Sequence, residues 1–173
     1  AFHAFGSIPS DNRVARITDL KHCPGGSTGS KLFLNVEYQR PDPNLHTNLF
    51  VKFSRDFTDA MRDRQRTEME SEARFEAITR LPDFPISVPF AYFADYHHDS
   101  GTGLVITQRI AFGQNGIEKQ HRKCGDHELH DPLPYYRLLI SALARLAAAH
   151  KAGRLASDIE VLFPYDPRAA SAD

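Results

Sequence analysis

The sequence predicts an α+β fold, in which an antiparallel sheet of about five strands packs against one long helix and a helical part follows. Three observations favour it. Several segments before residue 110 alternate apolar and polar residues, which is typical of half-buried strands. A charged segment between them contains neither Gly nor Pro until Pro82, as a helix requires. The residues that follow Pro134 repeat apolar side chains at helical spacing.

The composition excludes several classes of function. Apolar residues make up 41% of the chain and charged residues 25%, which are the values of a globular protein. The net charge of -1 lacks the basic excess of a general nucleic-acid binder. No apolar run approaches the roughly 18 residues of a membrane span. Two cysteines, Cys23 and Cys124, make no disulfide framework, so we expect a cytoplasmic protein. From the net charge and the short apolar runs we expect neither nucleic acid nor a membrane as partner.

A Gly-rich loop joins the first two expected strands, residues 13–23 and 32–38. A Walker-type loop places Lys directly after Gly and continues into a helix, whereas here Ser30 precedes Lys31 and a strand follows. A Gly-rich hairpin lets backbone N–H groups approach phosphate oxygens without a Cβ in the way. An ordinary hairpin turn is the alternative. The candidate phosphate-contacting residues are Gly25, Gly26, Ser27, Thr28, Gly29 and Ser30.

The third strand and the helix after it carry a candidate ion pair. Alternation in residues 48–53 places Lys52 beside Phe50 and opposite the apolar face, where burial is costly without a partner. The helix is expected to begin at a cap at Thr58 or Asp59 and to run to about residue 80. Glu72 lies three residues from both Met69 and Phe75, so it shares their inward face. We expect Glu72 to pair with Lys52, with Glu68 and Glu76 as rivals.

Two further strands are expected at residues 90–96 and 104–110, because the prolines at 82, 85 and 89 prevent the helix from continuing. The polar stretch HHDSGTG between them is typical of a hairpin turn. The order is therefore strand, Gly-rich turn, strand, strand with Lys, helix with Glu, strand, strand.

Residues 13–166 resemble the aminoglycoside phosphotransferase and choline kinase-like branch of the protein-kinase superfamily. SEARFEAI is similar to the family's helix pattern, and YYRLLISALARLAAAHKAGRL to the helix that opens its large lobe. The resemblance implies a kinase-like small lobe at residues 1–110, with linker and large-lobe start at 111–173. It also implies ATP or GTP with Mg²⁺ as cofactor and a small-molecule hydroxyl as acceptor. The nucleotide contacts would then include Lys52, Glu72 and, at the hinge beside the base, Gln108, Arg109 and Ile110.

The chain departs from this family at three places. Pro24 stands where the family's loop has its first Gly, although Gly26 and Gly29 fit the pattern. Gln108 replaces an acidic hinge residue. We do not find the catalytic pattern H-x-D followed by Asn, which supplies the base and a metal ligand. We therefore expect the nucleotide-binding portion of a longer phosphotransferase, without turnover of its own. The apolar stripe of Leu139, Leu143, Leu146 and Ala147 would then promote self-association.

Two alternatives come from other classes of protein. His121, Cys124, His127 and His130 are spaced by three residues and are each capable of binding zinc, although a polar linker between the lobes is the favoured interpretation of this stretch. A kinase-like chain without its catalytic loop is also compatible with a catalytically inactive nucleotide-binding or scaffold module. In that case the pair of Lys52 and Glu72 would be structural.

Overall fold

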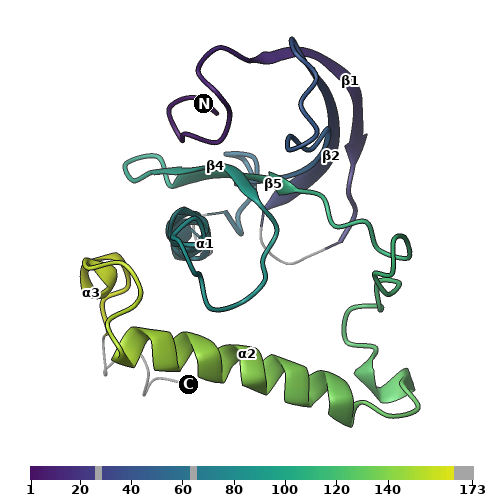
Figure 1. The fold of residues 1–173 in the computed structure, drawn as a ribbon, viewed down its shortest axis with the longest axis vertical. Coiled ribbons are helices and arrows are strands. Elements are labelled where there is room, and N and C mark those ends of the chain that lie inside the picture. The colour runs from purple at the N-terminus through teal and green to yellow at the C-terminus, as the bar shows by residue number, and fades with distance from the viewer. Residues whose placement is uncertain (26–28, 63–65, 166–173) are drawn as a thin grey trace.

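The computed structural model describes residues 1–25, 29–62 and 66–165. It has an α+β architecture with one five-stranded antiparallel sheet in the order β1-β2-β3-β5-β4 (Figure 1). The sheet has the five strands expected from the sequence, with ends shifted by up to a few residues. The strands are β1 (Val14–His22), β2 (Ser30–Tyr38), β3 (Asn48–Phe53), β4 (Ala91–His97) and β5 (Thr102–Gln108). The helices are α1 (Arg66–Ile78), the short 3₁₀ turn η2 (Asp126–Glu128), α2 (Leu133–Lys151) and α3 (Ile159–Leu162).

The register between β2 and β3 gives the sheet two different faces. Leu34 lies opposite Leu49 on one face, whereas Lys31 lies opposite Lys52 on the other. Helix α1 packs against β4 and β5 on the side that carries Lys52. At Gly103 an added Cβ would lie 3.0 Å from the Cβ of Met69. Glycine there lets α1 approach the sheet closely.

The opposite face of the sheet carries the main hydrophobic core, and the N-terminal residues cover it (Figure 1). Leu49 and Tyr92 are fully buried there. Phe2 packs on Tyr92 with ring centroids 5.3 Å apart, and Ile8 belongs to the same cluster. The Ser7 hydroxyl donates a hydrogen bond of 2.6 Å to the Tyr92 carbonyl. The segment before β1 is therefore an integral layer of the fold.

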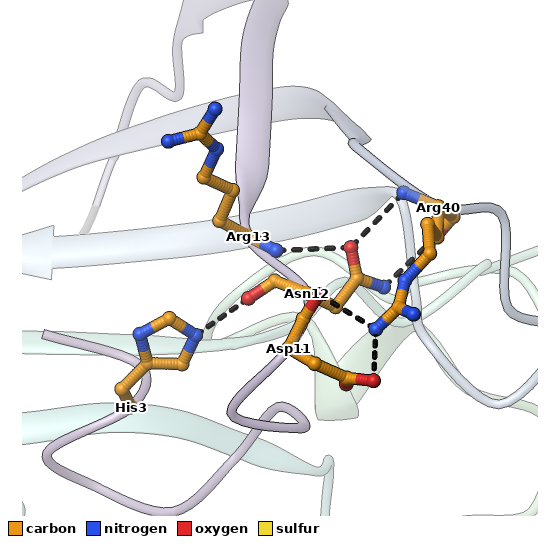
Figure 2. Close-up of polar contacts among 5 residues, drawn as sticks. All are labelled: His3, Asp11, Asn12, Arg13 and Arg40. Carbon is orange, nitrogen blue, oxygen red and sulfur yellow. Dashed lines mark hydrogen bonds and ion pairs between the residues drawn. The ribbon is translucent and has the colours of Figure 1, made fainter.

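Asn12 fixes this N-terminal segment to the end of β2 (Figure 2). Its side-chain oxygen accepts hydrogen bonds from the backbone N–H groups of Arg13, at 2.9 Å, and Arg40, at 3.0 Å. Its amide donates to the Arg40 carbonyl at 2.9 Å. The His3 ring forms a hydrogen bond to the Asn12 carbonyl oxygen. The Asp11 carboxylate forms an ion pair with the Arg40 guanidinium. Asn12 is only 4% exposed, so these bonds replace water that cannot reach it.

Helix α1 begins later than the sequence suggested. Thr58 and Asp59 do not cap it, because both belong to a turn before residue 62. The Asp56 carboxylate accepts hydrogen bonds from the backbone and hydroxyl of Thr58, and the Asp59 carboxylate accepts one from the Met61 N–H at 2.8 Å. Such local side-chain bonds compete with helix formation. The described helix starts at Arg66.

Helix α2 extends from the far end of the linker and crosses beneath α1 (Figure 1). It begins at Leu133, next to Pro134, after which the sequence repeats apolar residues at helical spacing, and it ends at Lys151. Leu139 and Leu143 are 62% and 65% exposed, whereas Ala149 near the other end is buried. The Arg74 guanidinium donates to the Leu162 carbonyl and so joins α1 to α3. Among the described residues, no helix combines the length and apolarity needed to cross a bilayer.

We predict that Asn12→Ala lowers the free energy of unfolding by about 1–3 kcal/mol, because it leaves two backbone N–H groups and one carbonyl without their partner. Urea denaturation monitored by circular dichroism measures this change. Asn44→Ala is the control, since Asn44 is exposed and its side chain bonds to the neighbouring Asp42 carboxylate; its cost should stay below about 0.5 kcal/mol. Equal costs for the two variants would contradict a clamp at Asn12.

Candidate functional site

The structure brings Lys52 and Glu72 together between the sheet and α1. The Lys52 ammonium contacts both Glu72 carboxylate oxygens, at 2.5 Å for Oε2. The Lys52 side chain is 12% exposed and that of Glu72 is 39% exposed. Alternation along β3 turns Lys52 to the α1 side of the sheet, and helical spacing turns Glu72 toward it. The pairing expected from the sequence is therefore formed, and it links the two elements.

The two rival carboxylates are placed differently. Glu68 is exposed in the first turn of α1. Glu76 lies one turn beyond Glu72 and lines a pocket on the α1 side of the sheet. Neither forms an ion pair with Lys52 in the described part of the chain. Glu72 is thus the carboxylate that neutralises this lysine.

The Gly-rich turn is described only at its two ends. Gly26, Ser27 and Thr28, which we expected to contact phosphate, lie outside the described residues. Gly25 adopts a φ of +90° and Gly29 a φ of +66°. A Cβ at Gly29 would lie 2.5 Å from the Phe53 carbonyl oxygen, so close packing against β3 explains this glycine without any ligand. Ser30 is the first residue of β2 and not part of the loop.

Lys31 is a second cation at this turn, and sequence reasoning did not include it. Its ammonium donates a hydrogen bond of 2.6 Å to the Gly25 carbonyl. It lies directly across the ladder from Lys52. Burial and the neighbouring Lys52 and Lys123 cations lower the pKa of Lys31. Two lysines side by side repel each other, so an anion bound between them would relieve that repulsion.

A pocket of about 720 Å³ opens on the same face of the sheet, where Phe33 and Phe50 lie two residues along their strands from Lys31 and Lys52. Phe33 and Phe50 line it, with ring centroids 6.2 Å apart. The Arg109 guanidinium lies 3.8 Å from the centroid of the Phe33 ring, and buried Thr107 contributes to the wall. Aromatic side chains with polar groups among them suit a flat ring system that carries hydrogen-bonding atoms. Strand alternation predicted that Phe50 lies on the same face of the sheet as Lys52. The register between β2 and β3 adds that Phe33 lies directly across the ladder from Phe50.

The segment expected to serve as a hinge borders this pocket. Gln108, Arg109 and Ile110 all line it. The Gln108 N–H already donates to the Phe90 carbonyl at 2.8 Å, and the Arg109 N–H donates to the Asn48 carbonyl at 3.0 Å. Neither N–H is therefore available to a ligand. Within the residues that the structure describes, the Ile110 N–H has no hydrogen-bond acceptor.

Glu76 is the acidic group of the pocket. Its Oε2 atom is buried and has no hydrogen-bond partner among the described residues. Burial, together with the negative charge of Glu72, raises the pKa of Glu76 to about 7. Sequence reasoning considered Glu76 only as a partner for Lys52. Its spacing of four residues from Glu72 is the signal that places it on the same inward face.

The alternative zinc ligands are not gathered into a site. In residues 1–25, 29–62 and 66–165, no three or more His, Cys, Asp or Glu side chains are arranged to hold a metal ion. His121 instead contacts Glu118 at 3.1 Å, and Cys124 is exposed. The region between β5 and α2 thus gives no support to a zinc centre.

The arrangement combines two neighbouring lysines with a pocket that aromatic side chains line in part. Lys31 and Lys52 provide the positive charge, and the pocket between Phe33, Phe50 and Thr107 provides flat contact surface. A ligand that fits both parts carries an anionic group attached to an aromatic ring system.

Comparison of the chain with family models, with curated proteins and with solved structures gives no match.

We predict that Glu72→Ala destabilises the fold more than Lys52→Met does. Lys52 is the more deeply buried partner, so removing Glu72 takes the counter-charge from a desolvated cation and costs about 2–4 kcal/mol. Lys52→Met leaves Glu72 near solvent and costs about 1 kcal/mol. Urea denaturation of both variants and of the double variant gives the comparison.

Glu37→Ala serves as the control for removing a carboxylate. It breaks the ion pair between Arg16 and Glu37. The Arg16 side chain is 68% exposed and the Glu37 side chain is 54% exposed. Its cost should remain below about 1 kcal/mol. If Glu72→Ala lowers the free energy of unfolding no more than Glu37→Ala does, the ion pair between Lys52 and Glu72 does not stabilise the fold.

Proposed function

We propose that this chain binds ATP, together with Mg²⁺, as the nucleotide-binding lobe of a phosphotransferase that acts on the hydroxyl of a small molecule. The observation that carries the proposal is the ion pair between Lys52 on β3 and Glu72 on α1. In kinases, a lysine held this way contacts the nucleotide phosphates. The order of elements around the pair, with a Gly-containing turn before it and a strand hairpin after it, supports the same function.

The geometry assigns a part of the nucleotide to each side of the site. Lys31 and Lys52 lie next to each other across the ladder and neutralise phosphate charge. The base occupies the pocket that Phe33, Phe50 and Arg109 line, where it contacts aromatic side chains and the guanidinium. Its edge faces residues 108–110, and the Ile110 N–H is the donor available to it. Mg²⁺ arrives with the nucleotide and is held largely by phosphate oxygens and water.

The proposal assigns nucleotide binding, and not phosphoryl transfer, to these residues. Transfer requires a base and metal ligands at the reacting phosphate. The described residues between β5 and α3 offer no cluster of such groups. The second candidate function is therefore a catalytically inactive nucleotide-binding or scaffold module, and it is favoured by the same ion pair if that pair is purely structural.

A nucleotide titration tests the proposal. We predict that the wild-type chain binds ATP saturably with Mg²⁺ present, and that Lys52→Met weakens binding at least tenfold because a phosphate contact is lost. Isothermal titration calorimetry at low salt measures both. Lys151→Met is the matched control, since Lys151 is exposed at the end of α2 and far along the chain from the pocket residues. It should bind ATP as the wild type does.

Three results would count against the proposal. Absence of ATP binding in the wild-type chain removes it and leaves the scaffold function. Equal affinities of wild type and Lys52→Met show that the ion pair holds no phosphate. Equal losses in Lys52→Met and Lys151→Met show that only general charge matters. Circular dichroism of each variant establishes that its fold is retained.

We further expect the chain to self-associate through α2. Leu138, Leu139, Ile140 and Leu143 are all well exposed, and such an apolar patch favours association with a second copy. Light scattering over a concentration series should show masses above 19.5 kDa. The double substitution Leu139→Ser and Leu143→Ser should restore the monomer. A wild-type chain that stays monomeric at every concentration contradicts this expectation.

A further inference from the structure

The proposed function leaves the Glu76 carboxyl group of the pocket unused. Glu76 reaches the pocket from α1, and its buried Oε2 atom has no partner among the described residues. A buried carboxyl oxygen without a hydrogen bond is costly. A ligand group that bonds to it removes that cost. Glu76 therefore has a physical reason to contact whatever fills the pocket.

Glu76 and the segment after β5 border the same pocket from different elements. Residues 108–110 run from the last residue of β5 into the segment after it, whereas Glu76 belongs to α1, and buried Thr107 lines the same pocket. A purine whose N1 faces residue 110 has N7 on the adjacent edge, and the group on C6 lies between N1 and N7 and is shared by both edges. This second edge is the one left for Glu76.

We propose that Glu76 is a specificity-determining residue that selects adenine over guanine at this second edge. The inference rests on the proposed nucleotide-binding function. Adenine offers one acceptor, N7, and one donor, the amino group on C6, at this edge. A neutral carboxyl group also offers one donor and one acceptor. Guanine offers two acceptors, N7 and O6, so one of them always opposes a Glu76 oxygen.

The surroundings of Glu76 favour its neutral form. The charged and titratable groups around it are Glu72 on the same helix, Lys52 on β3, Arg109 after β5 and Cys23 after β1. Lys52 is committed to Glu72. Burial, with the Glu72 charge, raises the pKa of Glu76 to about 7. The neutral form therefore prevails below pH 7 and is lost as the pH rises through 7.

This ionisation makes ATP binding depend on pH. If only neutral Glu76 accepts adenine fully, the competent fraction falls from about 0.9 at pH 6 to about 0.1 at pH 8. ATP affinity should then fall about tenfold over this range. GTP should bind more weakly than ATP at both values, because neither form of the carboxyl matches two acceptors.

The test compares wild type with Glu76→Gln in calorimetric titrations of ATP and GTP at pH 6 and pH 8. The amide keeps one donor and one acceptor but does not ionise. Glu76→Gln should bind ATP at both pH values about as tightly as the wild type binds it at pH 6. Titration of the ATP phosphates affects both proteins alike, so the difference between them isolates Glu76. Glu68→Gln, an exposed change on the same helix, should behave as wild type.

A second measurement needs no variant. At pH 8 the ATP phosphates are already ionised, so proton uptake on binding reports on the protein. Titrations in two buffers of different ionisation enthalpy should give close to one proton taken up per ATP.

The outcomes separate this inference from the function on which it rests. Saturable ATP binding with no proton uptake, or with the same pH response in wild type and Glu76→Gln, overturns the role of Glu76 and leaves nucleotide binding intact. GTP binding as tight as ATP binding also overturns it. Absence of ATP binding at pH 6 overturns both.

Discussion

The Lys52 ammonium is a charge carried into the interior of the molecule, and the organisation of the site follows from how it is neutralised. Its side chain lies beneath α1 and is largely withdrawn from solvent. Desolvating a cation is costly unless a counter-charge and hydrogen bonds compensate it. Glu72 supplies both, which fixes the rotation of α1 about its axis. That rotation in turn buries Met69 against the sheet and turns Glu76 into the pocket.

The same constraint gives the two faces of the sheet distinct roles. The face with Leu49 and Tyr92 is apolar, covered by the N-terminal segment and closed to solvent. The α1 face carries Lys31, Lys52 and the aromatic pair beside them. A single alternation of side chains along β2 and β3 generates both. The main hydrophobic core and the proposed binding site thus lie on opposite sides of one layer.

Much of this organisation could be predicted from the sequence because it depends on short periods. Alternation gave the strands and the side on which Lys52 lies, and helical spacing singled out Glu72. Lys31 was missed because its importance depends on which residue lies across the ladder, and register is not a local property. The prediction that Thr58 or Asp59 caps α1 was wrong, because local turns and helix caps use the same residue types. Asn12 was missed because a single buried amide in an irregular segment has no period.

The N-terminal layer has a kinetic consequence. Ser7 bonds to Tyr92 across a separation of 85 residues along the chain, so its docking closes a very long loop. Contacts of such separation are entropically expensive to form early. During synthesis the segment before β1 must therefore wait for β4 before it can settle. Until then the face of β2 and β3 that carries Leu49 stays uncovered, and this interval is when the nascent chain is most exposed to aggregation and most in need of a chaperone.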